Sequence, residues 1–158
     1  MVALCAEASH AVGATPNLYC QPMHELDLPR RYRTIYVCGG LGLGSTRAQD
    51  QQALGRLCEH LEPGGRLILD NEVPYADGNH WGCWPAGRRD GLPEVAQPPG
   101  ARRLGSDGCE YALRSRMLSV DPLRQQEAWE MHAFQWRDGA LIAQERHQLT
   151  INLYFWLF

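Results

Sequence analysis

The segment from Arg33 to Asp70 constrains the fold more than any other part of this chain. It reads RTIYVCGGLGLGSTRAQDQQALGRLCEHLEPGGRLILD. The β-branched and aromatic run Thr34 to Cys38 predicts a buried strand that ends in glycines. Apolar residues at helical spacing predict a helix from Gln49 to Leu61, and Leu67 to Leu69 predicts a second strand. The order strand, helix, strand indicates a βαβ crossover with parallel strands.

Glycines and acids mark the ends of these expected elements. Pro63-Gly64-Gly65 is expected to end the helix and form a tight turn before the second strand. Ligands bind parallel sheets at the carboxyl ends of the strands. Cys38-Gly39-Gly40 and Asp70-Asn71-Glu72 should therefore share one edge, and we expect the function of the chain to reside there.

The flanking segments extend this α/β pattern. Met1 to Val12 predicts a short helix closed by Gly13, and Asn17 to Cys20 predicts a small strand. Residues 73–105 are rich in proline, glycine and tryptophan and show no period, which predicts a long irregular loop acting as a lid or binding loop.

Three long β-like runs predict an antiparallel meander over Glu110 to Leu153. The Asp138-Gly139 pair between two of the runs is a strong hairpin signal. The expected fold class is α/β, a Rossmann-like three-layer sandwich with this meander at its C-terminal end. One domain should cover residues 1–158, with an α/β part in 1–72, the loop or lid in 73–105 and antiparallel strands in 106–158.

Composition excludes several classes of function. The 158 residues are 44% hydrophobic and carry a net charge of −3, without the basic patch that nucleic acid or a membrane surface requires. The six cysteines form no C-x-x-C pair and the six histidines no H-x-x-x-H pair, so we expect no metal site. The widely spaced cysteines favour a reducing, cytoplasmic location.

In this order of elements the chain resembles class I S-adenosylmethionine (SAM)-dependent methyltransferases that act on small molecules. LDLPRRYRTIYVCGG and LCEHLEPGGRLILD resemble the family's fourth strand, following helix and fifth strand. LYCQPMHELDL resembles its third strand and adenine-contacting loop, and WRDGALIAQERHQLTINLYF resembles its terminal antiparallel strands. The resemblance implies SAM as cofactor and a small-molecule methyl acceptor.

Two features of the family are not found in this sequence. The family holds SAM with an acidic, glycine-rich loop after the first strand and with an acid after the second, and neither motif precedes Asn17. The expectation is a methyltransferase domain that is incomplete at its N-terminus and lacks the first βαβ unit. Because the family holds the cofactor with these motifs, we expect the chain to bind SAM weakly or not at all. Such a domain would also leave an edge of the strand Thr34 to Cys38 unpaired, so we expect self-association through that edge.

The resemblance also assigns candidate site residues. Gln21 and Met23 would border the adenine ring, whereas Cys38, Gly39 and Gly40 would line the methionine side of the cofactor. The aromatic residues expected to cover the acceptor are Tyr75, Trp81 and Trp84.

Two further residues are candidates for proton transfer. Purely structural roles stay open for one of them and for the loop aromatics. His80 in the irregular loop and Glu72 just past a strand end are candidate catalytic groups. The loop aromatics could instead pin the loop to the core, and Glu72 could be an ordinary exposed turn carboxylate. Cys38 is interpreted as a small core residue rather than a nucleophile.

Two other functions compete with methyl transfer. One is a catalytically silent methyltransferase-like domain or subunit that keeps the acceptor pocket without the cofactor. The weaker one is a nucleotide-binding oxidoreductase, because Gly40-x-Gly42-x-Gly44 follows a strand and opens toward a helix, as dinucleotide fingerprints do.

Overall fold

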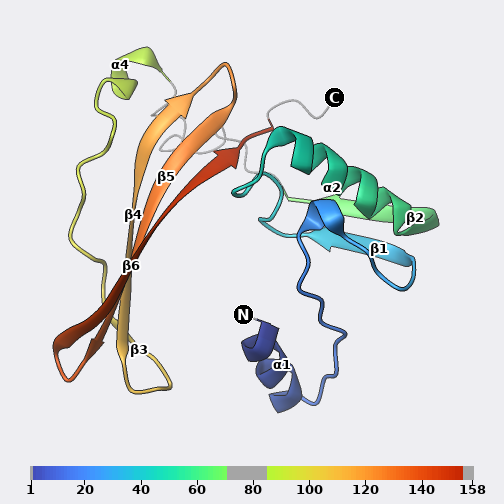
Figure 1. Cartoon of the computed structure of the whole chain (residues 1–158), viewed down its shortest axis with the longest axis horizontal. Coiled ribbons are helices and arrows are strands. Elements are labelled where there is room, and N and C mark those ends of the chain that lie inside the picture. The colour runs from blue at the N-terminus through green and yellow to red at the C-terminus, as the bar shows by residue number, and fades with distance from the viewer. Residues whose placement is uncertain (1, 71–84, 155–158) are drawn as a thin grey trace. The chain divides into compact units, whose positions relative to one another are not determined.

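The computed structural model describes residues 2–70 and 85–154 as two compact units. The first unit comprises Met1–Tyr36 and Ala48–Ile68, and the second comprises Val37–Arg47 and Leu69–Phe158. Helices and a small sheet occupy the first unit, and a larger antiparallel sheet occupies the second (Figure 1). The fold class is therefore α/β. The three-layer sandwich and the single domain remain predictions.

The N-terminal part of the first unit agrees only partly with expectation. Helix α1, Val2–Ala11, is followed by Gly13 at a φ of 73°, as predicted. The strand predicted at Asn17 to Cys20 is wrong, because these residues have no regular secondary structure. A strand requires a hydrogen-bonded neighbour, and the small sheet of the described part of this unit pairs only β1 with β2. The 3-10 helix Met23–Glu25 follows in the predicted loop.

The βαβ unit is confirmed. Strand β1, Tyr32–Val37, pairs with β2, Leu61–Leu69, and helix α2, Arg47–Glu59, connects them. The backbone N–H at the start of β1 donates to the carbonyl of His60 at 2.7 Å, and the N–H of Asp70 donates to the end of β1 at 3.2 Å. The start of β1 therefore lies beside the start of β2, and the end of β1 lies beside the end of β2. The two strands run parallel. Ala53 and Leu57 are the buried apolar residues of α2. The expectation that the first strand is buried is wrong, because β1 belongs to a two-stranded sheet and Val37 is its one buried residue.

The role predicted for Pro63-Gly64-Gly65 is wrong. The helix already stops at Glu59, and all three residues lie inside β2 rather than in a turn before it. The reason is that the His60 carbonyl pairs with β1 directly after the helix, which starts the ladder early. Gly64 at a φ of 71° then forms a local irregularity within the strand.

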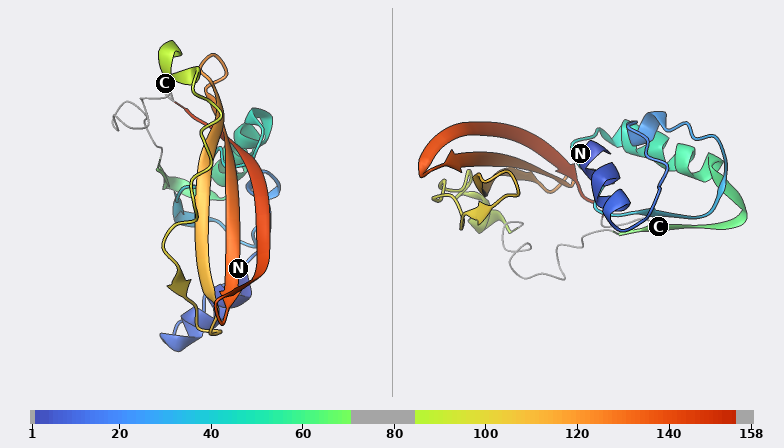
Figure 2. Two further views of the ribbon diagram at one scale, coloured as in Figure 1. Left: turned by 90° about the vertical axis from the view of Figure 1, so that its left-hand side faces the viewer. Right: turned by 90° about the horizontal axis from the view of Figure 1, so that it is seen from below.

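The second unit holds the predicted meander, now confirmed. Strands β3, Arg103–Leu104, β4, Glu110–Asp121, β5, Gln126–Arg137, and β6, Ala140–Asn152, form one antiparallel sheet in sequence order (Figure 2). The hairpin between β5 and β6 turns at Asp138 and Gly139, which have φ values of 51° and 79°. Positive φ at both central positions is the condition for a type I′ turn.

One face of the meander is buried and contains both apolar and charged side chains. Ala112, Phe134 and Trp136 form its apolar cluster. Glu130, only 4% exposed, accepts a hydrogen bond from the Arg116 guanidinium at 2.9 Å. That contact holds the pKa of the Glu130 carboxyl below its ordinary value. Pairing of this kind makes a buried carboxylate tolerable in a sheet.

The described part of the predicted loop, residues 85–105, contacts β4. A short helix, α4, Ala86–Arg89, comes first, and the chain then runs along β4 as far as β3 (Figure 1). The N–H of Glu94 donates to the Met117 carbonyl at 2.9 Å, and that of Gly100 donates to the Leu113 carbonyl at 3.1 Å. This segment therefore covers the outer edge of β4. Within residues 2–70 and 85–154, no helix has the length and apolar character needed to cross a membrane.

Candidate functional site

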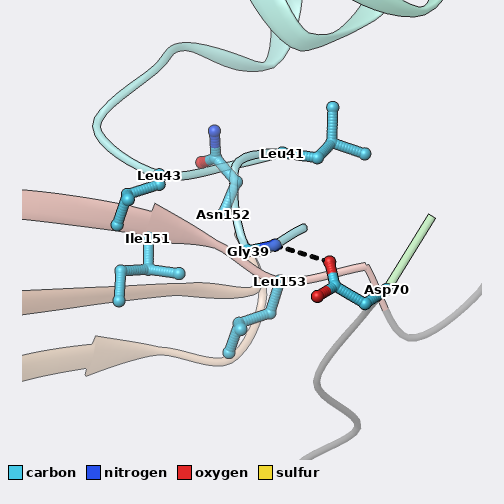
Figure 3. Close-up of a pocket in the computed structure, with 7 residues that line it drawn as sticks. All are labelled: Gly39, Leu41, Leu43, Asp70, Ile151, Asn152 and Leu153. Atoms are coloured by element: carbon cyan, nitrogen blue, oxygen red, sulfur yellow. Dashed lines mark hydrogen bonds between the residues drawn. The ribbon is translucent and has the colours of Figure 1, made fainter. Parts of the chain in front are cut away.

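A pocket of about 240 Å³ lies in the second unit at the end of β6 (Figure 3). We call it the Asp70 pocket. It combines the turn after β1, the residue after β2 and the last residues of β6. Its lining residues are Gly39, Leu41, Leu43, Asp70, Ile151, Asn152 and Leu153. The pocket thus sits where the parallel strands end, which is the edge at which such sheets bind ligands.

Asp70 is fixed by the turn that follows β1. The backbone N–H of Gly39 donates to Asp70 Oδ1 at 2.6 Å (Figure 3). This bond is the main cause that lowers the pKa of the Asp70 carboxyl below its ordinary value of 3.8, and the thiol of Cys38 contributes in the same direction. The prediction that Cys38-Gly39 and Asp70 share one edge is confirmed for these residues.

The ionisation of Asp70 should be visible at Gly39. A lowered pKa means that the bond between Gly39 and the carboxylate is fully present above pH 3.8 and is lost as the pH falls through the lower, folded-state pKa. The amide of Gly39 should therefore titrate with a midpoint below 3.8 in two-dimensional NMR spectra. Asp70→Asn should remove this titration, and Cys38→Ala should move the midpoint upward. A midpoint at or above 3.8 would contradict the geometry.

The segment Gly40 to Gly44, which we call the glycine-rich run, is hydrogen-bonded to β6. Asn152 donates its backbone N–H to the Gly42 carbonyl at 2.8 Å, and Gly44 donates to the Thr150 carbonyl at 2.8 Å. Leu43 and Ile151 form an antiparallel bridge between these two bonds. A Cβ on Gly42 would lie 2.3 Å from the Asn152 carbonyl oxygen, so only glycine allows this approach. The run therefore works as a docking segment, and the N–H of Gly44 is already used within the chain.

Asn152, which lines the pocket, connects the end of β6 with Ser45 and with Gln126 at the start of β5. Its side-chain nitrogen donates to the Ser45 carbonyl at 2.8 Å, and its Oδ1 accepts from the Gln126 amide at 2.7 Å. The residue is 2% exposed. Both ends of the amide are thus satisfied inside the protein, as a buried polar group requires.

Arg47 holds the glycine-rich run in place from the C-terminal side of that run. Its guanidinium donates to the carbonyls of Arg124, Gln125 and Leu153 and lies 4.9 Å from the centre of the Tyr154 ring. The turn that carries Gly39 is therefore held at both ends, by Asp70 on one side and by β6 with Arg47 on the other.

The predicted cofactor residues fall into two groups. Gly39 lines the pocket, with Cys38 and Gly40 beside it in the turn. Gln21 and Met23 belong to the first unit. There the Gln21 side chain bonds both to the N–H and to the carbonyl of Asp27, at 2.9 and 3.1 Å.

One interpretation of these residues is wrong. Cys38 is exposed rather than a core residue. The reason is that the last buried side chain of β1 is Val37 and the chain leaves the strand there. The thiol then faces Asp70, as the hydrogen bond between the two side chains shows.

The remaining candidates lie outside the described residues. They are Glu72, Tyr75, His80, Trp81 and Trp84. Conversely, the sequence interpretation did not identify the apolar walls Leu41, Leu43, Ile151 and Leu153, or Asn152. An available signal was the polar Asn152 within the otherwise apolar run Ile151 to Phe158.

Comparison with solved structures gives the fold. An S-adenosylmethionine-dependent methyltransferase from Clostridium acetobutylicum matches 96% of this chain and 53% of its own, at a TM-score of 0.60 and 16% identity. DesVI from Streptomyces venezuelae matches 96% of this chain and 56% of its own, at a TM-score of 0.58 and 18% identity. No protein-family model matches the chain, and no curated protein matches it significantly.

These likenesses confirm the resemblance at the level of fold. The chain has the class I SAM-dependent methyltransferase fold over the part that it shares with these proteins. It spans about half the length of the solved structures that it matches.

Proposed function

We propose that the chain takes part in SAM-dependent methyl transfer to a small-molecule acceptor, with the Asp70 pocket as the site. The observation that supports this proposal is the position of the pocket. An ionised carboxylate and a rigid glycine turn meet at the carboxyl ends of two parallel strands, in a chain with a methyltransferase fold. The pocket volume of about 240 Å³ lies just below the usual range for ligand sites, which favours a small acceptor over a macromolecule.

The residues of the pocket fit part of SAM. SAM carries positive charge at its ammonium and sulfonium groups, and the only charged side chain among the seven lining residues, all of them described, is the Asp70 carboxylate. In the proposal Cys38, Gly39 and Gly40 face the methionine portion.

SAM, when bound, supplies an activated methyl group, so the chain needs to position the acceptor and keep water away rather than provide a strong acid or base. Leu41, Ile151 and Leu153 provide an apolar wall for this purpose. The bond from Gly39 to Asp70 holds the carboxylate in one orientation. We further propose that Tyr75, Trp81 and Trp84 cover the acceptor.

The 158-residue chain by itself should bind SAM only weakly. Asp70 is exposed, and water screens the attraction between an exposed carboxylate and a cation, whereas a millimolar Kd already requires about 4 kcal/mol. We expect a Kd near or above 1 mM, with amide shifts concentrated at Cys38, Gly39 and Gly40 in an NMR titration.

NAD is the control ligand for this titration, because it tests the competing oxidoreductase function. Shifts of equal size with NAD would favour the nucleotide-binding oxidoreductase, and no response of the turn to several millimolar SAM would overturn the proposed function. A micromolar Kd for SAM would show that this part of the fold carries more of the cofactor site than its contacts indicate.

A further inference from the structure

Strand β6 leaves part of one edge of the meander open. It is the last strand of its sheet, and on its outer side the glycine-rich run pairs with residues 150–152 (Figure 2). Within the described part of the chain, no strand pairs with the outer side of residues 140–148, which we call the open edge. We propose that the open edge binds a second copy of this chain, strand against strand. This inference is independent of the proposed methyl transfer.

The open edge is exposed on both faces of the sheet. All side chains of residues 140–148 are exposed, whereas buried side chains recur along the neighbouring strand β5. Leu141 and Ile142 are 48% and 50% exposed. Proteins shield edge strands from other chains with prolines, charges or a covering loop. The segment 85–105 covers the edge at β4, but residues 140–148 contain no proline and no described segment covers them.

The backbone of the open edge offers hydrogen bonds at every second residue. The Thr150 carbonyl and the Asn152 N–H bond outward to the glycine-rich run, whereas the Leu153 N–H bonds inward to the Gln125 carbonyl. Successive residues of an antiparallel strand alternate between its two sides, and the register with β5 is regular over residues 143–152. The residues whose N–H and C=O groups point outward are therefore Gln144, Arg146 and Gln148.

The glycine-rich run limits where a second copy can pair. It occupies the outer side of residues 150–152, so two copies related by a twofold axis overlap most completely when their open edges are antiparallel and centred on Gln144. Glu145 then lies opposite the uncharged Ala143 of the second copy. Arg146 likewise lies beside the uncharged Ile142. A centre at Glu145 or Arg146 would place two like charges directly opposite each other, which is unfavourable.

The contact is small, so the dimer should be weak. The open edge is about 30 Å long, and a single strand pair of this length lies at the low end of the size range of specific interfaces. In this register the two Glu145 carboxylates are diagonal neighbours, although each contacts His147 of its own chain at 3.3 Å. We expect a dissociation constant on the order of 0.1 mM. Sedimentation equilibrium of the full chain should show the average mass rising from one chain toward two over this concentration range.

Hydrogen exchange distinguishes edge pairing from other kinds of association. The amides of Gln144, Arg146 and Gln148 should exchange about fivefold more slowly at about 1 mM protein, because about one fifth of the chains remain monomeric at that concentration. The amides of Glu145 and His147 point toward β5 and should not change with concentration. Alternating protection is therefore the signature of the proposed dimer.

Gln144→Pro removes one outward N–H at the centre of the contact. An edge strand tolerates proline where the N–H does not bond to the neighbouring strand, so the variant should keep the fold and lose the dimer. Gln144→Ala is the matched control, because it keeps the N–H and should dimerise as the unmodified chain does. If Gln144→Pro does not fold, the exchange pattern and the cysteine pair below decide.

Cysteine substitution tests the register without proline. In the proposed dimer the two Gln144 positions face each other at a Cα separation of about 5.5 Å, which permits a disulfide. Gln144→Cys should therefore form a covalent dimer under mild oxidation. His147→Cys is the control and should give no more cross-linked dimer than the unmodified chain, because its two positions lie far from each other in this register.

Three results would overturn the inference. The first is a chain that stays monomeric at about 1 mM. The second is a dimer that Gln144→Pro leaves intact, or slowed exchange along Tyr32–Val37 instead of the open edge, which would place the second copy on the strand edge expected from the sequence. The third is cross-linking of His147→Cys as readily as of Gln144→Cys, which would exclude the pairing centred on Gln144.

Discussion

Replacing Gly42 with alanine should lower the free energy of unfolding by about 3–4 kcal/mol. The new Cβ would lie 2.3 Å from the backbone oxygen of Asn152, and backbone cannot move aside as a flexible side chain can. The residue also has a φ of 83°, a conformation that is unfavourable for alanine. Urea unfolding monitored by circular dichroism measures the loss as a change in midpoint at constant slope.

Gly44→Ala separates the two causes. Gly44 has a φ of 70°, but a Cβ there meets no atom within 4 Å. Its replacement should therefore cost only the conformational part, about 1–2 kcal/mol. Equal losses for Gly42→Ala and Gly44→Ala would show that the close approach of the glycine-rich run to β6 does not exist in solution.

Asn152→Ala should cost about 2–4 kcal/mol. The substitution removes two hydrogen bonds and leaves the amide of Gln126 and the carbonyl of Ser45 without this partner in a site that is almost completely buried. The expected secondary effect is a loosened turn, so the amide of Gly39 should exchange with solvent faster. Hydrogen exchange and urea unfolding report the two effects separately.

The exposed amide of Gln144 in the same strand provides the control for Asn152. Gln144→Ala should change stability by less than about 0.5 kcal/mol. In a double-mutant cycle, Asn152→Ala and Gln126→Ala should show a coupling of about 0.5 kcal/mol or more because their side chains bond directly. If Asn152→Ala behaves like Gln144→Ala, the amide does not join the segments.

Local signals predicted those parts of the fold that depend on neighbours in sequence. Asp138-Gly139 specified its turn because few residue pairs tolerate two successive positive φ angles. Apolar periodicity predicted α2 with an error of two residues at each end. Pro63-Gly64-Gly65 misled because the same residues suit a helix stop and an irregular strand, and pairing with β1 decided between them.

The site was predictable only at the edge defined by strand ends. The adjacency of Gly39 and Asp70 follows from parallel strands and was expected. The other half of the pocket comes from Ile151 to Leu153, which reach the glycine-rich run through contacts between distant parts of the chain. No periodicity within either segment encodes such a contact. Asn17 to Cys20 shows the converse, since a strand-like composition did not produce a strand.

The contact between the glycine-rich run and β6 has a consequence for biosynthesis. Ser45 and Asn152, which hold the two segments together, are 107 residues apart in the chain. At translation rates of about 5–20 residues per second, the ribosome needs roughly 5–20 s to reach Asn152 after making Ser45. The turn that carries Gly39 consequently leaves the ribosome before its partner strand exists. The Asp70 pocket therefore cannot form until the ribosome has made Asn152.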